Sequence, residues 1–271
     1  MAASFATLSS KSVLADCDVD STDLHLIIKP HIKRTTGFHA KKLASIDKIL
    51  CTSCKTCYDF CRFHAIDEEI HVIKELCEGC GVCHYVCPND AIKMIQRDSG
   101  LVYISDTRCG PMSHASLKTA EEASGKLITV VRNNARTIAE RHKKELIIID
   151  GPPGVGYPVF STIIGVDLVV IVTEPTLSAL QDLKRIIKAS QHFNIPAVVC
   201  INKYDINLQN TEEITKYCAK NSIEVVGKIP YDTIINDAMI QEKSVVEFSD
   251  ELTSRTIKDM WTKIQEKLTT Q

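Results

Sequence analysis

The stretch C-T-S-C-K-T-C-Y-D-F-C at residues 51–61 recurs, with the same cysteine spacing, as C-E-G-C-G-V-C-H-Y-V-C at residues 77–87. These two motifs hold eight of the 12 cysteines in the chain. Each motif is followed at the same offset by Ala-Ile, first at residues 65–66 and then at residues 91–92. The shared spacing and offset indicate an internal duplication.

Three thiolates at C-x2-C-x2-C can wrap one corner of an iron–sulfur cubane, because the short loops point backbone N–H groups at the sulfurs. The fourth cysteine of each run lies too far along the chain to close the same site comfortably. The segment resembles a bacterial two-cluster ferredoxin domain over roughly residues 47–98, and in such ferredoxins the fourth cysteine ligates the other cluster. The second motif has the usual Pro88 after its last cysteine, whereas the first has Arg62.

This resemblance implies two [4Fe–4S] clusters with crossed ligand sets. The sets are Cys51, Cys54, Cys57 and Cys87 for the first cluster, and Cys77, Cys80, Cys83 and Cys61 for the second. Two other interpretations compete with it. Zinc ribbons use pairs of C-x2-C rather than two runs of four cysteines. Disulfides need an oxidising compartment and usually a signal peptide, and the N-terminal sequence has no such pattern.

The composition excludes several classes of function. The chain has 271 residues, enough for one large or two smaller domains, and 24% of its residues are charged. A net charge of −2 predicts no binding to nucleic acid or to a membrane surface by bulk electrostatics. No apolar run reaches the roughly 18 residues that a membrane span needs. Together with the many free cysteines, these features predict a cytoplasmic protein.

Outside the cysteine motifs, apolar runs separated by helix-length segments predict an α/β fold. Buried strands are expected at 13–15 and 146–149, and each leads directly into an aspartate. Acidic residues at the carboxyl end of a buried strand belong at the ligand-binding edge of the sheet. After the first strand, the alternative is a polar turn that caps the next helix. Further strands at 168–172, 197–201 and 225–229, with helices at about 178–193, 211–221 and 252–268, predict a parallel sheet.

Four other segments complete the expected organisation. Residues 30–46 are predicted to be a polar connector, and 91–95 and 101–104 to be two strands around a hairpin turn at 98–100. A loop is expected at 109–112, where Cys109 is interpreted as an ordinary thiol rather than an extra ligand. A turn and strand are expected at 125–131, followed by a basic helix at 133–144.

Four motifs identify the α/β portion by resemblance: D-C-D at 16–18, I-I-I-D-G-P-P-G at 147–154, I-N-K-Y-D at 201–205 and I-P-Y-D at 229–232. In that order they resemble MinD/ParA-type P-loop ATPases, and more narrowly MinD-superfamily ATPases that carry an inserted ferredoxin domain. The resemblance covers nearly the whole chain. It implies a discontinuous parallel-sheet P-loop NTPase-like domain at 1–46 and 99–271, with an α+β ferredoxin-like domain inserted at 47–98.

The same resemblance implies roles for individual residues around ATP and Mg²⁺. Asp18 would position or activate the attacking water, with Asp16 in support near the metal. Asp150 corresponds to the Walker B aspartate that holds Mg²⁺. The switch loop and the base-binding residues would be Gly151, Gly154, Asn202, Pro230 and Asp232. Because N-K-Y-D is also similar to a GTPase motif, the choice between adenine and guanine stays open.

One part of the family pattern is missing, because G-x4-G-K-[S/T] does not occur in the sequence. The first strand and its phosphate-binding P-loop, or Walker A motif, are therefore expected to be absent. That absence would leave a gap beside the strand at 146–149. It would also remove most triphosphate affinity, since charge-assisted hydrogen bonds contribute roughly 1.5–3 kcal/mol each. The favoured explanation is a sequence that starts at an internal methionine, and the alternative is a degenerate ATPase half.

Three functions are therefore considered. The first is an iron–sulfur protein that couples nucleotide state to electron transfer or cluster delivery, although this chain is expected to hydrolyse ATP poorly or not at all. The second is a plain electron-transfer module, and the third is a scaffold that hands on clusters. Expected partners are a redox protein or an apo iron–sulfur protein. The family resemblance adds a homodimer or a heterodimer with a related ATPase.

Overall fold

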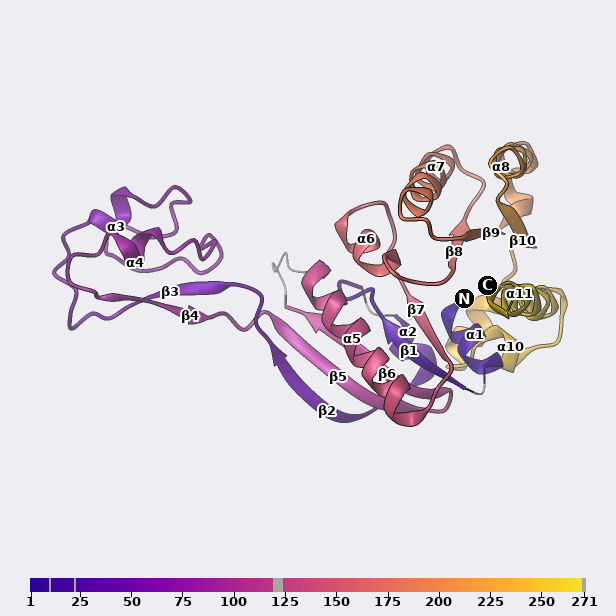
Figure 1. Cartoon of the computed structure of the whole chain (residues 1–271), viewed down its shortest axis with the longest axis horizontal. Coiled ribbons are helices and arrows are strands. Elements are labelled where there is room, and N and C mark those ends of the chain that lie inside the picture. The colour runs from indigo at the N-terminus through magenta and orange to yellow at the C-terminus, as the bar shows by residue number, and fades with distance from the viewer. Residues whose placement is uncertain (10, 22, 119–123, 270–271) are drawn as a thin grey trace.

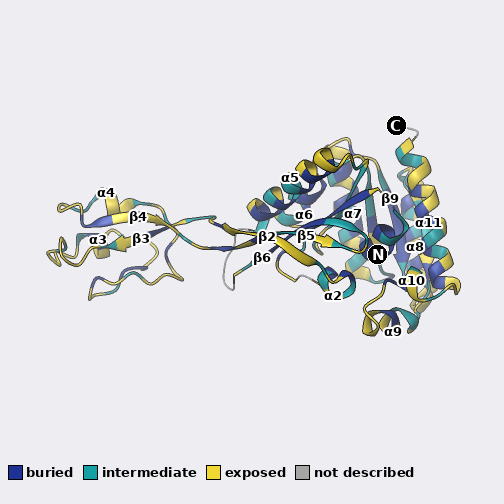
Figure 2. Cartoon of the chain, turned by 90° about the horizontal axis from the view of Figure 1, so that it is seen from below, coloured by how far each residue is buried: buried dark blue, intermediate teal, exposed yellow. Residues whose placement is uncertain are grey.

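A computed structural model describes residues 1–9, 11–21, 23–118 and 124–269. Figure 1 shows a large α/β body and a small unit that is held away from it by two extended connections. We call these connections, residues 38–42 and 96–100, the neck. Figure 2 shows the same separation from a perpendicular direction. The chain therefore leaves the body, forms the small unit, and returns to the same edge of the body.

The first sheet of the body has the strand order β2-β5-β6-β1-β7. The strands are β1 (Ser12–Asp16), β2 (His31–Phe38), β5 (Gly100–Thr107), β6 (Gly110–Leu117) and β7 (Leu146–Asp150). Strand β1 is parallel to both β6 and β7, whereas β5 is antiparallel to both of its neighbours, β2 and β6. Every residue of β1 is buried. The register places Asp16 opposite Asp150.

The second sheet has the order β10-β9-β8, and its strands are all parallel. They are β8 (Val169–Thr173), β9 (Ala197–Asn202) and β10 (Glu224–Ile229). Among the described residues no strand lies between β7 and β8, and a cavity of about 940 Å³ is lined by both strands together with Phe5 and Trp261. The sequence predicts a gap beside β7, and the structure has one there. We call it the strand gap.

Helices cover both faces of both sheets. On the first sheet, α5 (Ser124–His142) covers one face with its buried apolar stripe, and α1 (Ala2–Leu8) and α2 (Leu24–Ile28) cover the other. On the second, one face carries α6 (Tyr157–Ile163), α7 (Leu177–His192) and α8 (Leu208–Lys220). The other carries α9 (Ile234–Ile240), α10 (Val245–Phe248) and α11 (Leu252–Thr269). The body is thus a three-layer fold of the α/β class that the sequence predicts. The second sheet is parallel, as predicted, whereas the first is mixed, because β5 pairs antiparallel with β2 and β6.

The small unit is built on one antiparallel strand pair, β3 (Lys42–Ile46) and β4 (Ile92–Gln96). Two short helices, α3 (Thr56–Asp59) and α4 (Val82–Tyr85), lie in the two cysteine motifs. Each helix follows a residue in the left-handed region, at Lys55 and Gly81. The repeated sequence therefore forms a repeated local structure. Its core consists of Leu43, Ala44, Ala65, Ile66, Ile70 and Ile92 with several of the cysteines.

Four local predictions are wrong. Residues 30–46 are not a connector but contain β2 and β3. The segments 91–95 and 101–104 do not form a hairpin, because β4 pairs with β3 while β5 pairs with β2 and β6. The loop at 109–112 is largely the start of β6. Residues 125–131 are helical, because burial of Leu127, Ile128 and Val131 against the sheet outweighs the β-branched composition of that segment.

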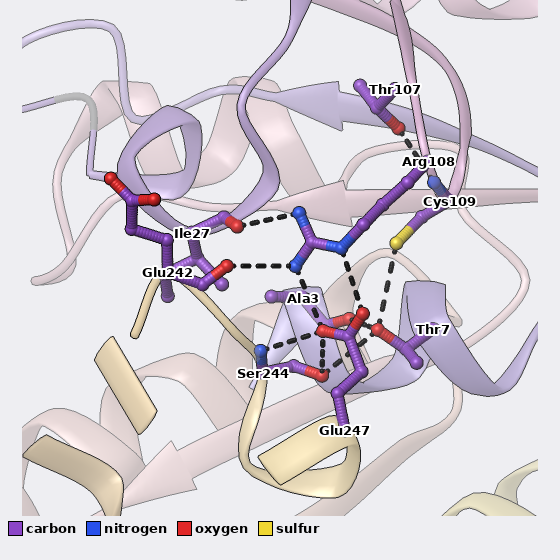
Figure 3. Close-up of polar contacts among 9 residues, drawn as sticks. All are labelled: Ala3, Thr7, Ile27, Thr107, Arg108, Cys109, Glu242, Ser244 and Glu247. Atoms are coloured by element: carbon purple, nitrogen blue, oxygen red, sulfur yellow. Dashed lines mark hydrogen bonds and ion pairs between the residues drawn. The ribbon is translucent and has the colours of Figure 1, made fainter. Parts of the chain in front are cut away.

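A polar network around Arg108 joins the N-terminal helices to the C-terminal part of the body (Figure 3). The guanidinium donates to both carboxylate oxygens of Glu247, at 2.8 and 2.9 Å, and to the carbonyl oxygens of Ile27 and Glu242, at 2.8 and 3.2 Å. Glu247 in turn accepts hydrogen bonds from the backbone and hydroxyl of Ser244 at the start of α10. The network holds α2, the β5–β6 turn and α10 together.

Candidate iron–sulfur and nucleotide sites

Four cysteines from both motifs line one cavity in the small unit. They are Cys51, Cys54, Cys57 and Cys87, and the walls of the cavity include Ile70, Ala91 and Ile92. The structure therefore brings three cysteines of the first motif together with the last cysteine of the second. This is the crossed set that the ferredoxin resemblance implies for the first cluster.

The cysteines of the second motif, together with Cys61, form a second set of thiols. Burial raises the pKa of Cys83 to about 11, and the charges of Cys77, Cys80 and Cys57 add to the shift. Cys61 lies in the same core, and its Sγ accepts the N–H of Ala65 at 3.3 Å. Cysteines of both motifs, including Cys57 and Cys83, lie in or against this one hydrophobic core, so the two sets of thiols are neighbours.

The donor chemistry of the first cavity fits an iron–sulfur cluster. Among the described residues, no group of three or more His, Cys, Asp or Glu side chains is arranged to hold a single metal ion; these four cysteines surround a cavity instead. Cys54 is exposed, and hydrogen bonding from Thr56 lowers the pKa of its thiol, which favours the thiolate that iron binds. Ser53 and Lys55 have positive φ angles of 56° and 61° between the cysteines, which marks the tight turns of this loop.

The second motif touches the neck. Gly79 has φ of +68°, and a Cβ there would lie 2.3 Å from the carbonyl oxygen of Lys42, so only glycine allows this approach. Beside it, Lys41 forms an ion pair with Glu78 at 2.7 Å. The second motif is therefore fixed against the start of β3.

In the body, Asp16 and Asp150 lie side by side at the carboxyl ends of β1 and β7. Asp16 is 1% exposed; its Oδ1 accepts the N–H of Asp18 at 3.2 Å, and its Oδ2 has no hydrogen-bond partner. Burial, and then the charge of Asp150, raise the pKa of Asp16 to about 7. Burial also raises the pKa of Asp150. A buried carboxylate oxygen without a partner, beside a second carboxylate, fits a divalent cation.

Asp18 is more exposed than Asp16 and caps a turn. Its Oδ1 accepts the N–H of Ser21 at 3.2 Å, and burial raises its pKa. The polar-turn interpretation thus describes the local geometry of Asp18 but leaves the orphaned oxygen of Asp16 unexplained. Across the edge, Gly151 and Gly154 border the strand gap, and Gly154 has φ of +91° with open space around it.

The remaining predicted residues lie at the same edge of the second sheet. Asn202 is the last residue of β9, and Pro230 directly follows β10. Asp232 uses both carboxylate oxygens, accepting the N–H of Ile234 at 3.0 Å and the hydroxyl of Thr253 at 2.6 Å, so it holds its own loop together. These residues are separated from Asp16 and Asp150 by the strand gap and β8.

Arg132 is a residue at this site that sequence reasoning missed. Its guanidinium donates to the carbonyl oxygens of Ser161 and Ile164, at 2.6 and 2.8 Å, and so caps the end of α6. Arg132 also lines the strand gap. No motif marks it, and the strand predicted at 125–131 hides the helical periodicity that places it.

Comparison with known proteins agrees with this architecture. Residues 70–93 match the family model "4Fe-4S binding domain". Residues of the chain are 39% identical, over 62 positions, to pyruvate synthase subunit PorD of Methanothermobacter marburgensis, covering 23% of this chain and 76% of that protein. The fold is similar to that of the septum site-determining protein MinD from Pyrococcus horikoshii, with a TM-score of 0.57 and 11% identity over 98% of this chain and 87% of that one.

The fold and the cysteine motifs therefore define a 4Fe–4S-binding protein with a MinD/ParA-like ATPase fold and a small inserted ferredoxin-like region. A similar fold occurs in an ATP complex of Cyanothece McdA, with a TM-score of 0.56, 15% identity, and coverage of 99% of this chain and 90% of that one. The chain belongs to the family of protein MJ0578 of Methanocaldococcus jannaschii, with 34% identity over 267 residues, 97% of this chain and 90% of that protein. Within the described residues, no helix is both long and apolar enough to cross a membrane.

Proposed function

We propose that this protein binds two [4Fe–4S] clusters and couples the state of the sheet edge at Asp16 and Asp150 to electron transfer or cluster delivery. The observation that carries the proposal is the shared cavity of three cysteines from one motif and one from the other. Because this set takes only one cysteine from the second motif, a second set of four remains, Cys61, Cys77, Cys80 and Cys83, which supports two clusters rather than one. Such clusters would supply one-electron redox chemistry, and the eight cysteines would hold and orient them.

The nucleotide part of the proposal rests on the acidic edge and the strand gap. Asp16 and Asp150 would hold Mg²⁺, and Asp18 would orient water. Phosphoryl transfer depends mainly on positioning and charge neutralisation, and residues 1–271 contain no glycine–lysine loop that would grip the β- and γ-phosphates. ATP hydrolysis would therefore require a strand and a phosphate-binding loop in the strand gap.

An iron and sulfide determination tests the cluster proposal. Anaerobically reconstituted protein should hold about eight irons and eight sulfides. Cys54→Ser and Cys80→Ser should each lose one cluster, whereas Cys218→Ser, a buried cysteine outside both motifs, should lose none. One tightly bound zinc without sulfide would contradict the proposal.

A second experiment tests the nucleotide part. The chain alone and the chain extended by an in-frame strand and glycine–lysine loop should be compared for Mg²⁺-dependent ATP binding and turnover. Only the extended protein should bind ATP. In it, Asp18→Asn should slow hydrolysis and leave binding largely intact, and Asp150→Ala should weaken both. Equal turnover in the shorter protein would show that the loop is dispensable.

The strand gap also favours a second candidate, a plain electron-transfer module in which the body only docks partners. No ATP binding in the extended protein would favour this candidate. In either case we propose a redox protein or an apo iron–sulfur protein as the partner, and a homodimer or a heterodimer with a related ATPase as the assembly. Transfer of cluster to an apo-acceptor would distinguish delivery from electron transfer.

A further inference from the structure

We propose that the neck transmits the conformation of the acidic loop at 16–19 to the second cysteine motif, so that changes at the sheet edge reach the second cluster rather than the first. This inference rests on the proposed function and names the route of its coupling. It follows from the direction of the strands, from a continuous series of hydrogen bonds, and from the position of each motif along the small unit.

Strand direction places the neck and the acidic loop at the same edge of the first sheet. Because β1 and β6 are parallel, Asp16 and Leu117 end their strands on the same side. Because β5 is antiparallel to β6, and β2 to β5, the neck begins beside Leu117, where Gly100 pairs with Leu117 and Phe38 pairs with Gly100. The small unit therefore projects from the edge that carries the two carboxylates.

Hydrogen bonds join the acidic loop to the neck without interruption. The carbonyl oxygen of Val19, three residues after Asp16, accepts the N–H of Leu117 at 3.3 Å. The next residue, Lys118, donates its N–H to the carbonyl of Ser99 at 2.9 Å, and its Nζ forms an ion pair with Asp98 at 2.5 Å. A movement of residues 16–19 would thus act on the β6 end and, through it, on the neck.

Ser99 is the centre of the neck and is fully buried. Its N–H donates to the carbonyl of Phe38 at 2.8 Å, and its hydroxyl accepts the N–H of Ala40 at 3.3 Å and donates to the carbonyl of Arg97 at 3.3 Å. Together with the bond from the N–H of Lys118, these contacts make Ser99 the residue that links both segments of the neck to the body. The connection between the small unit and the body is narrow there, as Figures 1 and 2 show.

From the neck, the nearest cysteine loop is the second one. Lys41 pairs with Glu78, and Gly79 lies against the backbone of Lys42. The first motif is at the other end, because β3 runs away from the neck to Ile46, and the cavity of the first motif is lined by Ile92, the register partner of Ile46. The second cluster would therefore be proximal to the body and the first would be distal.

Hydrogen–deuterium exchange on the whole reconstituted protein tests this route. The acidic loop at 16–19 is perturbed by Asp16→Asn or, in a second variant, by Asp18→Ala. Both variants can be measured without nucleotide. In the wild-type background, each variant should raise exchange of amides at 97–100 and 77–80 by about fivefold, the effect of one weakened hydrogen bond. Amides at 51–57 should not change. Ser99→Ala removes the hydroxyl bonds to Ala40 and Arg97 but keeps the backbone bonds of residue 99, so the effect at 77–80 should be smaller in that background. Ser45→Ala, at an exposed serine on β3, should leave the effect unchanged.

The spectrum of the clusters gives an independent readout. In chemically reduced protein, where a [4Fe–4S] cluster is paramagnetic, the electron paramagnetic resonance signal of the second cluster is assigned by its loss in Cys80→Ser. This signal should shift in Asp16→Asn and should shift less in the double variant with Ser99→Ala. Equal exchange at 51–57 and 77–80, or the same response with and without Ser99, would overturn the proposal. Iron analysis of the same samples tests the two-cluster function separately, because the exchange at 97–100 reports the coupling even if only one cluster is bound.

Discussion

Replacing Arg108 by methionine should destabilise the α/β body, because one guanidinium connects three separate segments of it. Arg108 donates four hydrogen bonds, two to Glu247 and one each to the carbonyl oxygens of Ile27 and Glu242. Hydrogen bonding from Arg108 also lowers the pKa of Glu247 to about 2. Methionine keeps most of the apolar stem, so the variant removes the polar contacts with little change in volume.

The magnitude follows from the exposure of the pair. A hydrogen bond contributes about 1 kcal/mol net, and more when it is charged and buried. Here the side chains of Arg108 and Glu247 are 36% and 22% exposed. Solvent therefore screens the charges, and each hydrogen bond contributes no more than a neutral one would. We expect the free energy of unfolding to fall by about 3 kcal/mol. For a chain of this size, that corresponds to a fall in Tm of about 6–12 °C. The fluorescence of Trp261, the single tryptophan and a buried one, would report the unfolding of the body.

Arg185→Met is the matched control. Arg185 pairs with Asp182 at 3.8 Å on α7, and the two side chains are 65% and 47% exposed. Such surface pairs contribute at most about 0.5 kcal/mol, so the Tm should change by no more than about 2 °C. Equal Tm values for the two variants would refute the reasoning, because they would show that the Arg108 network adds nothing beyond an ordinary surface charge.

Two further predictions concern a buried histidine and a close-packed glycine. Burial lowers the pKa of His114 from 6.5 to about 4, and its ring nitrogen lies 2.8 Å from the hydroxyl of Ser105. The free energy of unfolding should therefore fall by about 2–3 kcal/mol as the pH drops from about 6.5 to 4. In urea titrations, the stability of His114→Gln should depend less steeply on pH over this range. Gly79→Ala should release iron from the second site much faster than Gly81→Ala, because both have positive φ but only the first Cβ would collide with Lys42. Equal iron release to a chelator would contradict that expectation.

The sequence predicts that Cys51, Cys54, Cys57 and Cys87 come together, as they do around one cavity, because most of this arrangement is local. C-x2-C-x2-C spacing places three thiolates on one short loop, and the duplication supplies the fourth from the other repeat. The carboxyl ends of β1 and β7 are likewise predictable, since a continuous apolar run that ends in Asp16 or Asp150 has few alternatives to a buried parallel strand.

Other features depend on contacts between distant residues, which the sequence pattern does not show. Residues 125–131 contain β-branched residues, yet they form part of α5 because the sheet buries Leu127, Ile128 and Val131 on one helical face. Pairing partners are equally non-local: Ser99 looks like the centre of a hairpin turn in sequence, but it joins two sheets through the neck. The local role of Asp232 could not be predicted from the sequence either. Only the structure shows that its two carboxylate oxygens accept hydrogen bonds from Ile234 and Thr253.

The strand gap connects the question of nucleotide binding to the question of stability. Strands β7 and β8 each have one edge without a strand partner among the described residues, and both edges face the same cavity. Unpaired backbone groups at a buried edge are costly, and a parallel strand inserted there would satisfy both edges at once. A loop that followed such a strand would emerge at the carboxyl edge beside Asp16 and Asp150, where its N–H groups could face a phosphate. Sheet completion and phosphate binding are therefore one structural event, so the extended protein should melt at a higher temperature than residues 1–271 even without ATP.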